Sequence, residues 1–221
     1  MRYLIVLTVF SLFLISAKPS NTPVPVTLVF IVPAGYTPAY DPDQASLIVQ
    51  DWAARTQAWY ARETGKTVNV EYFYIHSIYT LQDYQGQAEV DACGMGADWG
   101  RTMNRVVVEL ENLGHPFSLP SRHWVVLAGG GGWAGGAWYG MNPDAGRFLL
   151  GDWELQEALG FTLPEGCGAG QTKGYGKSFG HETLNAMGSD PYNPSLFLDD
   201  AFSDRQRRMF LRHNKAFLRS P

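Results

Sequence analysis

The sequence has little cysteine, no long run of like charge and, beyond its first residues, no long hydrophobic segment. Its two cysteines, Cys93 and Cys167, exclude a disulfide-dense scaffold and a structural zinc site of Cys–His spacing. The formal net charge of −4 gives no indication of binding to nucleic acid or to an anionic membrane. Apolar residues make up 45% of the 221 residues, which is typical of a globular protein with a sizeable core.

The sequence also lacks several catalytic motifs. It contains no G-x-S-x-G nucleophile elbow. Gly176-Lys177-Ser178 ends like a phosphate-binding loop, but position 171, where that loop needs glycine, is Gln171. The glycine-rich segment 129–140 has no such lysine either, and we expect it to allow close backbone contact or to form a flexible flap. Nucleotide binding and serine hydrolysis are therefore disfavoured.

The N-terminus carries the most apolar segment of the chain. Arg2 is followed by YLIVLTVFSLFLIS and then by the small residue Ala17, the pattern of a signal peptide over residues 1–17. The run is shorter than the span of about 20 residues that crosses a membrane. We therefore expect a secreted mature chain from Lys18, with no membrane contact after cleavage.

Secretion bears on the two cysteines. In an oxidising compartment Cys93 and Cys167 are expected to form a disulfide, which the chain-entropy model values at about 4 kcal/mol. The alternative is a pair of unrelated thiols.

The order of the expected elements predicts one domain, 18–221, of the α+β class. A long helix is expected over 42–64, with Asp41 as N-cap, Gln44 in a capping box and Gly65 as the stop. A capping box of Ser203 and Gln206 predicts the last helix. The remaining predictions are strands at 26–32, 66–75 and 123–128, a helix at 100–113, a short strand with a turn within 147–160, and a helix from Lys177.

The segment KSFGHETLNAMGSDP, residues 177–191, contains half of a metal-hydrolase motif. In H-E-x-x-H the two histidines lie on one helix face and bind one metal ion, and the glutamate takes a proton from the metal-bound water. Here His181 and Glu182 are present, but Asn185 stands at the second histidine position.

Five further segments accompany this motif in a characteristic order, and with it the chain resembles secreted bacterial zincin-like peptidases. The segments are QAWYARETGKTV (57–68), YIHSIYT (74–80), WVVLAGGGGWAGGAWYG (124–140), GDW (151–153) and FSDRQRRMFLRHNKAFL (202–218). The resemblance implies a zincin-like (metzincin-type) fold, in which a mixed β-sheet carries two long helices and an active-site helix. It also implies bound zinc, a peptide substrate and a cleft beside an edge strand that holds the substrate. Four aromatic residues would line that cleft or else belong to the core: Trp133, Trp138, Tyr139 and Trp153.

The chain departs from the family pattern at the metal. Pro191 occupies the place of the third histidine, with Asp190 beside it, and Phe197 replaces the methionine beneath the metal. One hypothesis is a metal-dependent endopeptidase with His181, Asn185 and Asp190 as ligands and Glu182 as general base. An N-O-O set of this kind should bind zinc weakly and suit a harder ion better.

A second hypothesis is a pseudo-peptidase that binds peptides without metal. The third is an unrelated hydrolase that uses carboxylates, with Asp152 and Glu154 or Asp199 and Asp200 as the pair. Four other histidines could substitute as ligands or be ordinary surface or core residues: His76, His115, His123 and His213.

Overall fold

In the computed structural model the described residues are 22–86, 99–114, 120–131, 134–138, 145–163, 177–187 and 200–221. Several predictions concern residues outside these ranges. They are the signal peptide at 1–17, the disulfide between Cys93 and Cys167, the third ligand Asp190, and the residues His115, Trp133, Tyr139, Pro191, Phe197 and Asp199.

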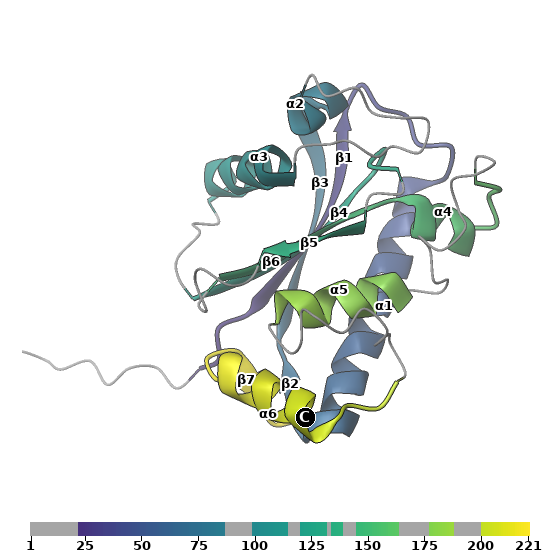
Figure 1. The fold of residues 1–221 in the computed structure, drawn as a ribbon. Coiled ribbons are helices and arrows are strands. Elements are labelled where there is room, and N and C mark those ends of the chain that lie inside the picture. Colours follow the sequence, from purple (N-terminus) through teal and green to yellow (C-terminus); the bar gives the residue numbers. More distant parts are fainter. Residues whose placement is uncertain are drawn as a thin grey trace, which may run out of the picture.

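A five-stranded sheet in the order β3-β1-β4-β6-β5 forms the centre of the molecule (Figure 1). Its parallel strands are β1 (Val26–Ala34), β3 (Val70–Thr80), β4 (Ser121–Leu127) and β6 (Ala145–Gly151). Strand β5 (Ala134–Trp138) pairs antiparallel with β6 at one edge. The sheet is thus mixed, as predicted, and helices accompany it in a mixed α/β structure.

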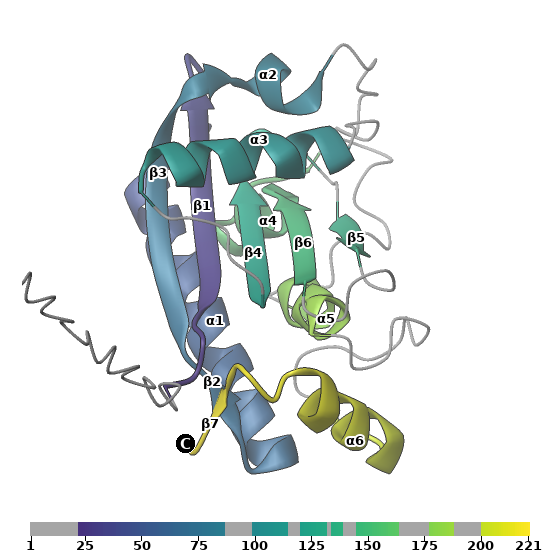
Figure 2. The same cartoon turned by 90° about the vertical axis from the view of Figure 1, so that its left-hand side faces the viewer.

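The sheet carries a hydrophobic layer on each face. Strand β1 lies between β3 and β4 and is almost wholly buried, which explains its continuous apolar run. Leu28 and Phe30 face the layer formed with α1 (Pro42–Thr64), whereas Val29 and Ile31 face the layer formed with α3 (Trp99–Asn112). Figure 2 shows α3 on one side of the sheet and α1 on the other.

Helix α1 begins and ends where the sequence predicts. Asp41 accepts a hydrogen bond from the Asp43 N–H at 3.0 Å, and Gly65 ends the helix with φ 68°. The predicted capping box with Gln44 is not formed, because the Asp41 side chain bonds to Asp43 instead. Trp52 and Trp59 are buried on its inner face.

The predicted strand 66–75 is divided in two. β2 (Thr67–Val68) pairs antiparallel with β7 (Leu218–Arg219), near the end of the chain, and β3 starts after Asn69. The other helices are α2 (Leu81–Gln85), α4 (Trp153–Ala158), α5 (Lys177–Ala186) and α6 (Asp204–His213). Helix α4 stands where a turn was expected, and α6 has the predicted capping box of Ser203 and Gln206.

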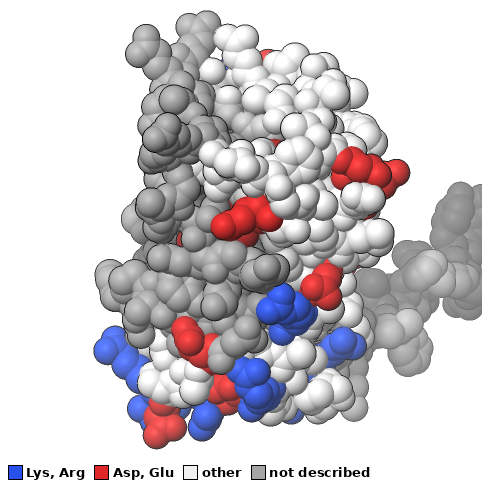
Figure 3. Space-filling model, turned by 90° about the vertical axis from the view of Figure 1, so that its right-hand side faces the viewer, with Lys and Arg blue, Asp and Glu red and all other residues white. Residues whose placement is uncertain are grey.

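Charge is unevenly distributed over the surface. On the described surface seen in Figure 3, the Lys and Arg side chains lie in the lower half. The described helices include none that is both long and apolar enough to cross a membrane.

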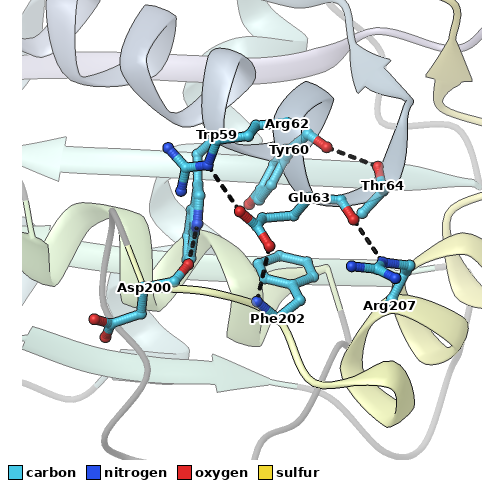
Figure 4. Close-up of polar contacts among 8 residues, drawn as sticks. All are labelled: Trp59, Tyr60, Arg62, Glu63, Thr64, Asp200, Phe202 and Arg207. Atoms are coloured by element: carbon cyan, nitrogen blue, oxygen red, sulfur yellow. Dashed lines mark hydrogen bonds and ion pairs between the residues drawn. The ribbon is translucent and has the colours of Figure 1, made fainter.

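The C-terminal end of α1 holds the segment that leads into α6 (Figure 4). The Trp59 indole N–H donates to the Asp200 carbonyl at 2.7 Å, and the Phe202 N–H donates to Glu63 Oε2 at 2.9 Å. Arg207 Nε donates to the Glu63 carbonyl at 2.6 Å. These bonds join two segments that are far apart in the sequence and fix α6 against α1.

Candidate functional site

The helix α5, which carries the motif, is anchored by one apolar face. Phe179 is fully buried, and its ring lies 5.8 Å from Trp52, 5.8 Å from Trp124 and 5.3 Å from Phe148. Leu184 belongs to the same cluster. This face packs α5 against β5 and β6 and leaves its other face for polar residues.

Three hydrogen bonds fix the first turns of α5. Glu154, on α4, accepts the Phe179 N–H through Oε2 at 3.1 Å. The Tyr60 hydroxyl on α1 donates to Thr183 Oγ1 at 2.5 Å, and Thr183 in turn donates to the Gly180 carbonyl at 2.7 Å. Helices α1 and α4 therefore determine where α5 begins and how it is rotated.

The C-terminal end of α5 lies directly on strand β6. A Cβ built on Gly146 would lie 1.7 Å from the Ala186 carbonyl oxygen, so only glycine fits there. Asn214, just after α6, donates to the Met187 carbonyl through Nδ2 at 2.6 Å. Asn214 also accepts from Arg122 Nε at 3.2 Å, and neither side chain is exposed by more than 1%. Strand β6 and the C-terminal segment thus hold this end.

The polar face of α5 brings together His181, Glu182 and Asn185. Asn185 Nδ2 lies 3.1 Å from His181 Nε2 and donates to Glu182 Oε2 at 3.2 Å. An amide nitrogen has no lone pair to accept with, so in this arrangement Nδ2 is the donor and Nε2 is the acceptor. The predicted i, i+4 juxtaposition is present, and Glu182 joins it.

The Glu182 carboxyl is strongly influenced by its surroundings. Its side chain is among the buried polar groups, at 8% exposure. Burial raises the pKa of Glu182, while the electrostatic influence of His181 and the hydrogen bond from Asn185 act in the opposite direction and do not outweigh burial. A carboxyl of this kind is suited to exchange protons nearer to neutral pH than an exposed glutamate.

The described part of the site does not fit a zinc ion in this arrangement. Zinc would need the lone pair on His181 Nε2, and that lone pair faces the Asn185 amide nitrogen, which is not a metal ligand. Presenting Asn185 Oδ1 instead requires a half-turn of the amide, which would bring that oxygen to Glu182 Oε2. Within the described ranges, no three His, Cys, Asp or Glu side chains gather as a metal-binding group.

Two of the substitute histidines, His76 and His123, lie away from this polar face. His76 is exposed on β3, at the opposite edge of the sheet from β5. His123 is buried on β4 with its side chain on the α3 face, because it alternates with Trp124, which faces α5. Burial, followed by Arg147 and Arg122, lowers the pKa of His123 to about 3.

The carboxylates of Asp152 and Glu154 are buried and accept hydrogen bonds that hold neighbouring segments together. Asp152 is fully buried and accepts from the Tyr40 hydroxyl at 2.8 Å and from the Gly129 N–H at 2.9 Å. Burial raises the pKa of Asp152. Glu154 is 2% exposed and bonds to α5 as described above. Trp153 is also buried, so it belongs to the core and not to a cleft wall.

The supporting residues of α5 were not found from the sequence. Tyr60, Glu154 and Asn214 each act across more than 20 residues of chain, and no local pattern marks such partners. The GDW segment at 151–153 directly precedes Glu154 and was the nearest sequence feature to any of these three supporting residues.

A comparison with models of known protein families finds no match to this sequence, and neither does a comparison with curated proteins.

Proposed function

We propose that this protein is a secreted, metallopeptidase-like binding protein that holds extended polypeptide beside α5 and does not cleave it through zinc. The observation that carries the proposal is the double hydrogen bond of Asn185. Its Nδ2 group satisfies His181 Nε2 and Glu182 Oε2 at once, at 3.1 and 3.2 Å. The Asn185 amide thus bridges the imidazole and the carboxylate, as a metal ion could do.

The chemistry of the donor set supports this choice. An asparagine side chain offers zinc only a neutral carbonyl oxygen, which is a weaker ligand than imidazole. The amide does suit the metal-free arrangement, since it donates two hydrogen bonds while zinc would need a lone pair from each ligand. The supports of α5 from Tyr60, Glu154 and Asn214 do not depend on a metal.

Strand β5 supports the binding part of the proposal. It is the last strand of the sheet in the described part of the chain, and α5 packs against it. An edge strand presents backbone N–H and C=O groups that can pair with an extended peptide. The resemblance to zincin-like peptidases implies the same use of the strand beside the motif helix.

A metal-dependent endopeptidase is the second candidate, and Glu182 favours it. A buried carboxylate with a raised pKa is what a general base needs, and a binding protein has no evident use for it. In this alternative His181, Asn185 and Asp190 would be the ligands, and the metal would supply an activated water.

Elemental analysis of the purified chain from Lys18, made without chelator or polyhistidine tag, distinguishes the two candidates. We expect far less than one zinc per chain after dialysis against zinc. About one zinc per chain, with peptide hydrolysis that disappears in Glu182→Gln, would establish the endopeptidase instead.

Asn185→His and its control Asn185→Ala test the donor set directly. We expect the histidine variant to bind zinc more tightly than the wild type, because it restores two imidazoles at i, i+4. The alanine variant removes the amide without adding a ligand and should gain nothing. Equal zinc binding in both variants would mean that position 185 does not face a metal site.

Amide hydrogen exchange tests the binding part separately. With an unfolded, carboxymethylated polypeptide added in excess, we expect slower exchange at residues 134–138 of β5, because the added chain pairs with the edge. Unchanged exchange across α5 and β5 would rule out peptide binding there.

A further inference from the structure

The last 18 residues of the chain differ in charge from the rest of the molecule. They hold six of the 17 Lys and Arg residues but only one of the 21 Asp and Glu residues. All six are exposed: Arg205, Arg207, Arg208, Arg212, Lys215 and Arg219. An otherwise acidic protein therefore has one basic end, formed by α6 and the segment after it.

A groove of about 590 Å³ opens at this basic end. Arg212, His213 and Lys215 contribute its polar lining, together with Thr22. Apolar and small residues complete it: Pro23, Val24, Pro120, Ala216, Phe217 and Leu218. We call this lining the basic groove, and its described residues include no carboxylate. The volume of the groove lies within the range of about 300–1,000 Å³ found for ligand pockets.

A buried cation lies behind the wall of the basic groove. The Arg122 guanidinium is 4.6 Å from the centre of the Phe217 ring, and Arg122 is 1% exposed. Its Nη2 donates to the His213 carbonyl at 3.1 Å. Arg122 therefore supports the wall of the groove through its contacts with Phe217 and with the His213 carbonyl.

We propose that the basic groove is a second binding site, separate from α5, that takes an acidic segment of a polypeptide. A carboxylate of that segment lies between Arg212 and Lys215, and a neighbouring apolar side chain packs on Phe217 and the two prolines. In the described part of the chain, neither Arg212 nor Lys215 forms an ion pair that would compete with the incoming carboxylate.

The shape of the site favours a polypeptide over a membrane. A flat bilayer cannot reach into a groove, and α6 buries Phe210 in the core, so the helix has no apolar face left for insertion. The groove is also small for a nucleic acid, which needs a charged surface that follows several phosphates. Both remain as outcomes of the test.

Fluorescence anisotropy with a labelled peptide of alternating glutamate and leucine measures this binding. The comparison uses two double variants that change the charge equally. Arg212→Glu with Lys215→Glu alters the groove, whereas Arg205→Glu with Arg208→Glu alters α6 outside its lining. We expect the groove variant to bind about tenfold more weakly and the α6 variant to bind within about twofold of the wild type.

Further outcomes separate this proposal from its alternatives. Equal weakening by both double variants would mean a diffuse charge effect and would overturn the groove. Tight binding of phosphatidylglycerol vesicles or single-stranded DNA, without peptide binding, would overturn the ligand class. Arg212→Gln with Lys215→Gln repeats the test without reversing charge, and circular dichroism checks that each variant is folded. Peptide binding unaffected by Asn185→His shows that the groove is independent of the α5 site.

Discussion

At Glu182, burial and hydrogen bonding act on the same carboxyl in opposite directions, and burial is the larger effect. The pKa of Glu182 is therefore higher in the folded chain than in the unfolded chain. Such a group lowers the unfolding free energy of the protein as the pH rises above the ordinary glutamate pKa of about 4.3.

Glu182→Gln should therefore stabilise the protein at neutral pH, by on the order of 1 kcal/mol, and should make no difference below the ordinary glutamate pKa. Urea unfolding of both proteins at a series of pH values measures this difference, and the Asp152 contribution cancels between them. A variant less stable than the wild type at pH 7 would contradict the account.

Glu63 provides the opposite case on the same molecule. Burial would raise its pKa, but the Phe202 N–H together with Arg62 and Arg207 lowers it below the ordinary value. Its stabilising contribution is present above the unfolded pKa and is lost as pH falls through the folded pKa. We expect Glu63→Gln to lower the unfolding free energy by about 1 kcal/mol at pH 7 through the weakened hydrogen bond to Phe202, and by less in acid. A loss independent of pH would show that the charge of Glu63 is not involved.

Among the elements, those with local signals were predicted well. Asp41 and Gly65 mark the two ends of α1 by their own chemistry, and the Ser203 capping box marks the start of α6. The i, i+4 spacing of His181 and Asn185 likewise follows from helix geometry alone.

Elements defined by distant partners were not predicted. β5 lies within the glycine-rich segment, where few side chains indicate a strand, and its pairing with β6 determines it. The division between β2 and β3 depends on β7, about 150 residues later. The position of α5 in the molecule depends on Tyr60 and Glu154 in the same way.

The contact between α5 and β6 gives a prediction for an element as a whole. Gly146→Ala places a methyl group against the Ala186 carbonyl, so α5 must move away from the sheet. We expect a loss of about 3 kcal/mol in unfolding free energy. Gly160→Ala is the control, because open space surrounds Gly160 and only its φ of 83° opposes the change, at about 1 kcal/mol. Equal losses in the two variants would mean that α5 does not rest on Gly146.

At the scale of the whole molecule, three separate segments hold α5 in place. Helix α1 contributes Tyr60, α4 contributes Glu154, and the segment after α6 contributes Asn214. These supports are present although Asn185 stands where the H-E-x-x-H motif has its second histidine. A helix held this firmly is useful to a protein that presents a fixed surface, whether or not it binds a metal.

Asn214 is the residue at which these long-range supports can be tested together. Its Nδ2 donates to the Met187 carbonyl at 2.6 Å and to the Phe210 carbonyl at 2.8 Å, and its Oδ1 accepts from buried Arg122 at 3.2 Å. Asn214→Leu fills similar space but leaves these groups without their partner, and we expect it to cost about 3 kcal/mol in urea unfolding. Lys215→Leu, one residue along on the surface, should change stability by less than about 0.5 kcal/mol.

Hydrogen exchange on the Asn214→Leu variant shows how far the effect extends. If α5 unfolds only with the whole molecule, the amides of residues 183–187 should lose protection by the same free energy as the core strand β1. A larger loss in α5 than in β1 would mean that the motif helix opens by itself, and that Asn214 stabilises the candidate site locally and not the fold as a whole.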